Sequence, residues 1–129
     1  MATLMASACQ RAPSAPDQTA PAAASNIVVM PSAAVLAQAG KLYAARCQVC
    51  HGVNGGGNGP MSAALSPAPR SFADSAWQRS ASNAGIADII VRGGKAVGRS
   101  ASMPAAPDLA SQPEVVAGLV ATVRGFEAK

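Results

Sequence analysis

The stretch Cys47-Gln48-Val49-Cys50-His51 places two thiols three residues apart and a histidine directly after the second thiol. This spacing is typical of the covalent attachment of a c-type haem. If the stretch forms one helical turn, both thiols share a face and each can form a thioether to a vinyl group of the porphyrin. His51 then lies where its neutral imidazole can bind the iron. The sequence therefore predicts one covalent haem c, held by Cys47, Cys50 and His51.

Two other uses of paired cysteines fit this sequence less well. A dithiol redox site expects a strand before a helix, and nothing around Cys47 has the pattern of a strand. A zinc site normally takes four ligands, whereas the chain has a single histidine and, besides the pair in the motif, only Cys9. Haem attachment is the interpretation that the residues favour.

Apolar residues recur at helical spacing on both sides of the motif. Ser32 is the predicted N-cap of a helix that runs through the motif and stops at Gly52. Gly40, inside that helix, is expected to mark close packing by another helix, with a tolerated surface glycine as the alternative. Residues 111–114, Ser-Gln-Pro-Glu, are predicted to be a capping box that opens a last helix, whose apolar stripe packs near Gly40 and Tyr43.

The middle of the chain is expected to hold one more helix and two loops. A helix capped by Ser82 or Asn83 is predicted to end at Gly93-Gly94, between loops at residues 52–71 and 95–110. A chain of 129 residues with 3% aromatic side chains allows one domain with little bulk for a core. Burial of a porphyrin supplies that bulk. We therefore expect an all-α bundle of short helices around one covalently bound haem, and a largely unfolded chain without it.

The second axial ligand and the surroundings of the haem are expected in the loops. Met103 precedes a proline that favours an extended backbone, and its thioether sulfur is a soft, neutral ligand that favours ferrous iron. Core packing of Met103 over five-coordinate iron is the alternative. Pro60 offers a carbonyl that can orient His51 by a hydrogen bond, while Arg70 and Trp77 each carry an N–H that can meet a haem propionate. Ordinary turn and surface roles stay open for these three residues.

The first 31 residues differ in composition from the rest. Small residues before Cys9 resemble a bacterial lipoprotein signal, which predicts a lipid on Cys9; a conventional cleaved signal or an idle thiol is the alternative. Residues 10–31 are rich in Ala, Pro, Ser, Thr and Gln and are predicted to be a disordered linker. The predicted divisions are thus a signal segment (1–9), a linker (10–31) and a haem domain (32–129).

Taken together, the motifs resemble those of class I cytochromes c over about residues 40–126. The resemblance rests on Gly40-Lys41-Leu42-Tyr43 before the haem motif, Gly59-Pro60, Gly93-Gly94 with Gly98, Met103-Pro104 and the Leu119-Val120-Ala121 to Arg124 segment. It implies a small cytochrome c-like fold whose haem c has His51 and Met103 as axial ligands. It also implies that the first and last helices cross, with Phe126 replacing the aromatic residue that the family often has at Thr122.

Filled axial positions leave no open site for a substrate, so the sequence predicts an electron carrier and not an enzyme. Two alternatives stay open. The chain can be a haem c subunit of a larger oxidoreductase, or a ligand-binding or catalytic haem protein in which Met103 is displaced. Haem attachment by this motif takes place outside the cytoplasmic membrane in the family, which implies a periplasmic protein that a lipid on Cys9 holds to the membrane.

The expected partners are an electron donor and an electron acceptor, both associated with a membrane. The protein itself is expected to be a monomer. The formal charge of +4 is small, and no basic run is interleaved with aromatic residues, which argues against nucleic acid as a partner. Arg92, Lys95 and Arg99 flank the loop of Met103 and are expected to attract an acidic protein surface. A merely solvated basic face is the alternative.

Overall fold

A computed structural model describes residues 30–128, and within this range the secondary structure is helical, as predicted. Its α-helices are α1 (Ala33–Leu42), α2 (Gln48–His51), α3 (Ser75–Ser80), α4 (Asn83–Ala96) and α5 (Pro113–Gly125). A π-helical turn, η1 (Tyr43–Cys47), joins α1 to α2, and the short 3-10 turns are η2 (Ser62–Ala64) and η3 (Pro107–Leu109). None of the helices in residues 30–128 has the length and apolar character needed to cross a bilayer. The predicted signal segment, the lipid on Cys9 and the linker up to residue 29 lie outside the described residues.

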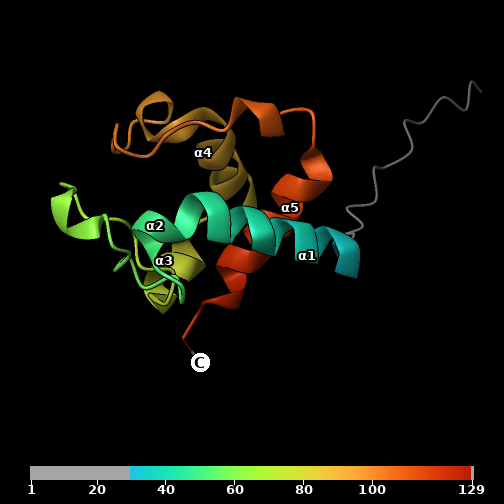
Figure 1. Cartoon of the computed structure of the whole chain (residues 1–129), viewed down its shortest axis with the longest axis horizontal. Coiled ribbons are helices and arrows are strands. Elements are labelled where there is room, and N and C mark those ends of the chain that lie inside the picture. The colour runs from blue at the N-terminus through green and yellow to red at the C-terminus, as the bar shows by residue number, and fades with distance from the viewer. Residues whose placement is uncertain (1–29, 129) are drawn as a thin grey trace, which may run out of the picture.

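The crossing of α1 and α5 forms the centre of the core (Figure 1). α1 begins as predicted, because the Ser32 hydroxyl accepts a hydrogen bond from the backbone N–H of Val35. The predicted apolar stripe of α5 is confirmed as buried at Val115, Val116, Leu119, Val120 and Val123. Phe126 lies at the end of this helix, and the centroid of its ring is 5.1 Å from that of the Tyr43 ring.

The glycine at which the two helices pack tightly is Gly118 of α5, so the prediction that Gly40 marks the contact is wrong. A Cβ atom on Gly118 would lie 2.9 Å from the Cβ of Ala39 and 3.1 Å from a methyl group of Val35. Gly40 is exposed, and a Cβ there would meet nothing within 4 Å. Helical spacing alone could not separate these cases, because a glycine inside a helix marks either a close contact or a tolerated surface position.

Substitution at these two glycines is expected to have opposite effects. Gly118→Val is expected to lower the free energy of unfolding by about 1–3 kcal/mol, because the added methyl groups would push α1 and α5 apart. Gly40→Ala, the matched control, is expected to raise it by about 0.5–1 kcal/mol, because alanine loses less conformational freedom in a helix. Urea unfolding of the haem-loaded variants measures both changes. Equal destabilisation by the two substitutions would contradict this packing.

α5 begins differently from the prediction. Its N-cap is Gln112, which makes no capping hydrogen bond through its side chain, and Pro113 occupies the first helical position. The predicted capping box of Ser111 and Glu114 is therefore wrong. Proline lacks the N–H that would otherwise be left without a partner at this position, so the helix start loses little without a cap.

α3 is a short helix that the sequence did not predict. The carboxylate of Asp74 caps it by accepting the backbone N–H groups of Ala76 and Trp77. Its buried residue, Gln78, donates its side-chain amide to the carbonyls of Phe72 (2.8 Å) and Val123 (2.9 Å). A helix of six residues is too short for a periodic apolar pattern to show, and here a polar side chain, not an apolar stripe, ties it to α5.

Candidate functional site

The paired cysteines and His51 lie at the end of one continuous helical segment, as predicted, but the segment is not α-helical throughout. In η1 the N–H of Gln48 bonds to the carbonyl of Tyr43, five residues back instead of four. Such π turns are rare and occur frequently at functional sites. Gly52 then ends α2 with a φ of 81°, a conformation that favours glycine.

Cys47 and Cys50 are free thiols, half-buried and three residues apart on this helical segment. Burial raises the pKa of the Cys47 thiol, an effect that the nearby Arg46 guanidinium opposes. Residues three apart on a helix are neighbours on its surface, so both sulfur atoms face the same region. This arrangement fits two thioether bonds to a single porphyrin.

His51 is held on two sides. Its Nδ1 atom lies 3.1 Å from the carbonyl oxygen of Arg70, and its ring stacks on the ring of Phe72 with centroids 4.4 Å apart and planes 15° apart. Because a carbonyl can only accept, Nδ1 carries the proton and Nε2 keeps its lone pair. Burial lowers the pKa of His51, although the Arg70 carbonyl opposes this effect. A neutral imidazole with Nε2 available is the form that binds iron.

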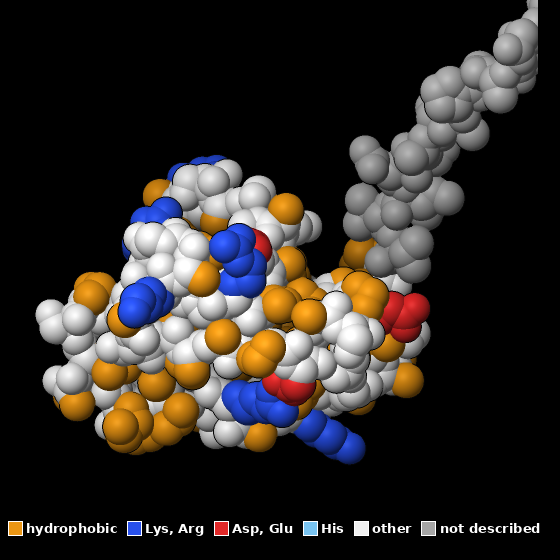
Figure 2. Space-filling view, turned by 90° about the horizontal axis from the view of Figure 1, so that it is seen from above, with side chains coloured by type: hydrophobic (Ala, Val, Ile, Leu, Met, Phe, Trp, Pro, Cys, Tyr) orange, Lys and Arg blue, Asp and Glu red, His pale blue; other side chains and the backbone are white. Residues whose placement is uncertain are grey.

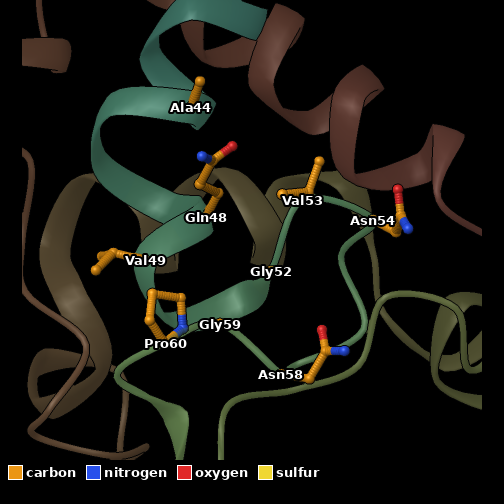
Figure 3. A pocket seen from close by; sticks show the side chains of 9 residues that line it. All are labelled: Ala44, Gln48, Val49, Gly52, Val53, Asn54, Asn58, Gly59 and Pro60. Carbon is orange, nitrogen blue, oxygen red and sulfur yellow. The ribbon is translucent and has the colours of Figure 1, made fainter.

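The partner of His51 Nδ1 is thus the Arg70 carbonyl, and the predicted use of the Pro60 carbonyl is wrong. Pro60 lies instead beside Gln48 and Val49, around a hollow of about 460 Å³ between α2 and the loop that follows it (Figure 3). A second hollow, of about 880 Å³ and mainly apolar, lies between α4 and α5. Neither hollow is lined by Cys47, Cys50, His51 or Met103.

The side chains of Arg70 and Trp77 have protein contacts of their own. The guanidinium of Arg70 lies 3.7 Å from the carboxylate of Asp74, and Trp77 packs on Phe72 with ring centroids 5.4 Å apart. Trp77 packs on Phe72, whose ring in turn stacks on His51, and Arg70 contacts His51 through its own backbone carbonyl. Their contacts with a haem propionate stay predictions.

Met103 lies on a loop that is fastened to α4. The Met103 carbonyl accepts the N–H of Gly94 at 3.0 Å, and the N–H of Ala106 bonds to the carbonyls of Ile90 and Val91. The helical run from Asn83 breaks at Gly93-Gly94, as predicted, because Gly93 has a φ of 77°; a further helical turn then continues α4 to Ala96. In the view of Figure 1, the loop of Met103 (orange) runs above α2, whereas the loop after His51 (green) runs to the left of and below it.

The Met103 side chain is half-buried, and the bend in α4 determines where its loop runs. A Cβ atom on Gly93 would lie 2.7 Å from the backbone nitrogen of Ala105, and one on Gly94 would overlap the Ser100 carbonyl oxygen. The paired glycines therefore let the loop backbone lie directly on the helix. This arrangement fits a second axial ligand that comes from a different loop than the one following His51.

Charged side chains near the loop do not form one strong basic cluster. Lys and Arg side chains are spread over the face shown in Figure 2, and acidic side chains lie beside some of them. The guanidinium of Arg92 pairs with the carboxylate of Asp88 at 3.1 Å, so its charge is largely compensated. The predicted basic cluster is thereby reduced to Lys95 and Arg99.

Tyr43 connects the helix before the motif to the turn after it. Its hydroxyl donates a buried hydrogen bond of 2.8 Å to the carbonyl of Gly52, and burial raises the pKa of Tyr43 from 10.0 to about 12. The folded state therefore holds the phenol proton more tightly than the unfolded state does. The resulting stabilisation is complete below pH 10 and is lost as the pH rises from 10 to about 12.

Tyr43→Phe is expected to lower the free energy of unfolding by about 1–3 kcal/mol, because the Gly52 carbonyl is left buried without its partner. As the pH rises from 10 to about 12, the wild-type protein is expected to lose stability because its phenol ionises. The variant has no phenol and is expected not to show this loss. Tyr43 is the only tyrosine of the chain, so the difference between the two pH profiles isolates its titration. Urea unfolding at pH values from 8 to 12 measures it. Parallel profiles for both proteins would contradict the assigned hydrogen bond.

Two features of the site were not predicted from the sequence, namely the Arg70 carbonyl and the stacked ring of Phe72. Every residue has a backbone carbonyl, so residue type does not show which carbonyl bonds to His51. Phe72 is one of two phenylalanines in an aromatic-poor chain, and its place in a loop rich in glycine and proline was the available signal that it packs on something specific.

Comparison with known proteins places this site among haem proteins. The family model described as cytochrome c oxidase, cbb3-type, subunit III matches residues 34–121. A solved structure titled KustC0563 c-type cytochrome is 34% identical in sequence and superimposes with a TM-score of 0.53. That match covers 69% of this chain and 96% of the other. No curated protein sequence matches the chain.

Proposed function

The chain belongs to the c-type cytochromes, in the family of cbb3-type cytochrome c oxidase subunit III, and from this membership we propose that it carries electrons through one covalently attached haem c. The observation that supports this most strongly is the state of His51. Its proton is fixed on Nδ1 by the Arg70 carbonyl, so its Nε2 is available for iron, on the same helical segment as two free thiols.

In this proposal Cys47 and Cys50 would hold the haem through thioether bonds, and His51 Nε2 and the Met103 sulfur would bind its iron. The haem supplies one-electron chemistry between ferric and ferrous iron. The protein residues supply rigidity. The Arg70 carbonyl orients the imidazole, and the hydrogen bonds between α4 and residues 103–106 hold the methionine loop in place.

Iron bound by both His51 and Met103 would favour electron transfer over ligand binding, and carbon monoxide distinguishes the two. The ferrous wild-type protein is expected to keep its spectrum under carbon monoxide, because Met103 already occupies the sixth position. Met103→Ala, the positive control, is expected to bind carbon monoxide readily. Rapid binding by the wild-type protein would favour the alternative in which Met103 is displaced by a ligand or substrate.

The family description favours a second candidate, a haem c subunit of a larger oxidoreductase. A free carrier is expected to purify alone as a monomer and to meet its donor and acceptor through brief contacts of less than about 1,200 Å². Purification of the tagged protein from its native membrane without added salt tests this. Stable recovery of stoichiometric partner subunits would support the subunit assignment.

We place the protein in the periplasm, held near membrane partners by a lipid on Cys9. A tethered domain meets partners in the same membrane at a raised effective concentration, which suits an electron carrier between membrane proteins. Mass spectrometry of the mature N-terminus tests the lipid. A mature chain that begins with acylated Cys9 is expected, and cleavage elsewhere would contradict the anchor.

A further inference from the structure

Phe72 contacts His51 but has no part in haem attachment or ligation. Its side chain is buried, at 8% exposure, and its ring lies against the imidazole in a nearly parallel stack. This contact differs from the hydrogen bond to Arg70, because it covers the face of the imidazole and not its edge. The inference drawn from it rests on the proposed role of His51 as an axial ligand.

The Phe72 ring is fixed by the protein from several directions. The backbone N–H of Phe72 donates to the Gly55 carbonyl at 2.7 Å, and its own carbonyl accepts the amide of Gln78 at 2.8 Å. Its ring also packs on Trp77 and Phe126, with centroids 5.4 and 6.4 Å away. Contacts from α3, from Phe126 at the end of α5 and from the loop at Gly55 therefore hold the ring in place.

Gln78 extends this support to the last helix. Its side-chain oxygen accepts a hydrogen bond of 2.7 Å from Arg124, and its amide also bonds to the Val123 carbonyl. Both donors and the acceptor of this buried amide are thus used. A side chain satisfied on every polar atom is held rigidly, and it transmits that rigidity to the Phe72 backbone.

We propose that Phe72 is a positioning residue that fixes the rotation of the His51 imidazole about the bond from Nε2 to iron. The hydrogen bond from Nδ1 to the Arg70 carbonyl holds one edge of the ring, but a hydrogen bond bends easily and leaves the ring some rotation about the bond from Nε2 to iron. The face of Phe72 limits that remaining rotation, because stacked aromatic rings have a preferred offset and separation. The Arg70 carbonyl thus holds the edge of the imidazole, and the Phe72 ring holds its plane.

The plane of an axial imidazole has a direct electronic consequence. Its π orbital overlaps with one iron d orbital more than with the other, so its rotation determines how unpaired spin spreads over the porphyrin in the ferric state. The haem methyl resonances of a ferric cytochrome report this distribution. They are a readout that a change in global stability alone does not move.

The test compares ferric haem methyl shifts in the full-length, haem-loaded protein. Phe72→Leu keeps an apolar side chain but removes the ring face, and it is expected to change the pattern of haem methyl shifts. Phe72→Tyr keeps the ring and is expected to retain the wild-type pattern. Phe126→Leu is the comparison variant, because it removes a ring that packs on Phe72 and Tyr43 and loosens the same cluster while leaving in place the ring face that contacts His51.

The expected result is a larger shift change in Phe72→Leu than in Phe126→Leu, with Phe72→Tyr unchanged. Equal changes in the two leucine variants, or no change in Phe72→Leu, would overturn the inference. If Phe72→Leu does not take up haem, Phe72→Met removes the ring with less loss of volume and is judged by the same comparison. A wild-type protein without low-spin His–Met iron would contradict the proposed function itself, whereas an unchanged pattern on a normal wild-type spectrum overturns only the role of Phe72.

Discussion

Replacement of both Cys47 and Cys50 by alanine is expected to give a colourless chain that has lost most of its helix signal. The buried apolar residues of the described chain number only ten, and half of them belong to α5. Burial of a porphyrin adds on the order of 10 kcal/mol at about 25 cal/mol per Å². Because a domain is typically stable by only about 5–15 kcal/mol, loss of the haem removes most or all of that margin. Far-ultraviolet circular dichroism measures the outcome.

Val49→Ala is the matched control for this double variant. Val49 lies between the two cysteines and is 40% exposed, so its replacement leaves both thiols and the core unchanged. This variant is expected to keep its haem and the wild-type helix signal. A double cysteine variant with native helix content would show that the polypeptide folds without the porphyrin and would refute the role given to the haem in stability.

Met103→Ala is expected to lower the reduction potential by on the order of 100 mV, a part of the roughly 0.8 V range over which axial ligands move haem potentials. The neutral sulfur favours ferrous iron, and water or hydroxide in its place favours the ferric form. The long-wavelength band of Met-ligated ferric haem is expected to disappear at the same time. Spectroelectrochemical titration measures both changes.

Met61→Ala is the control for this prediction. Met61 is 51% exposed, and its backbone N–H bonds to the Val49 carbonyl on α2, in the loop that follows His51. Its replacement is expected to leave the potential and the band unchanged. If Met61→Ala removed the band while Met103→Ala kept it, the assignment of the sixth ligand would be wrong.

Sequence reasoning succeeded where the chemistry is local to a short stretch. The N-cap at Ser32 and the apolar stripe of α5 depend on neighbouring residues, and both are confirmed. The haem motif lies on a helical segment as predicted, while the use of its residues stays a prediction. The π turn at residues 43–47 is also local, but it leaves the helical spacing of apolar residues almost unchanged. The family that the motifs resemble is confirmed by the comparisons.

Apart from the capping box of α5 and the short helix α3, the wrong predictions concern contacts between distant parts of the chain. Gly40 and Gly118 look alike in sequence, and only the crossing of α1 and α5 shows which of them needs to be small. Pro60 and Arg70 both offer a carbonyl to His51, and the path of the loop between them decides which one meets the imidazole. A backbone atom carries no sequence signal, so this choice required the fold.

The most direct test of the account is a redox-titrated visible spectrum of the protein produced in its own host. We predict a c-type haem spectrum that survives acid extraction of free haem, one reversible one-electron wave, and the band of methionine-ligated iron in the ferric state. A colourless protein, haem that extracts freely, or iron held by any pair of atoms other than one imidazole nitrogen and one thioether sulfur would contradict it.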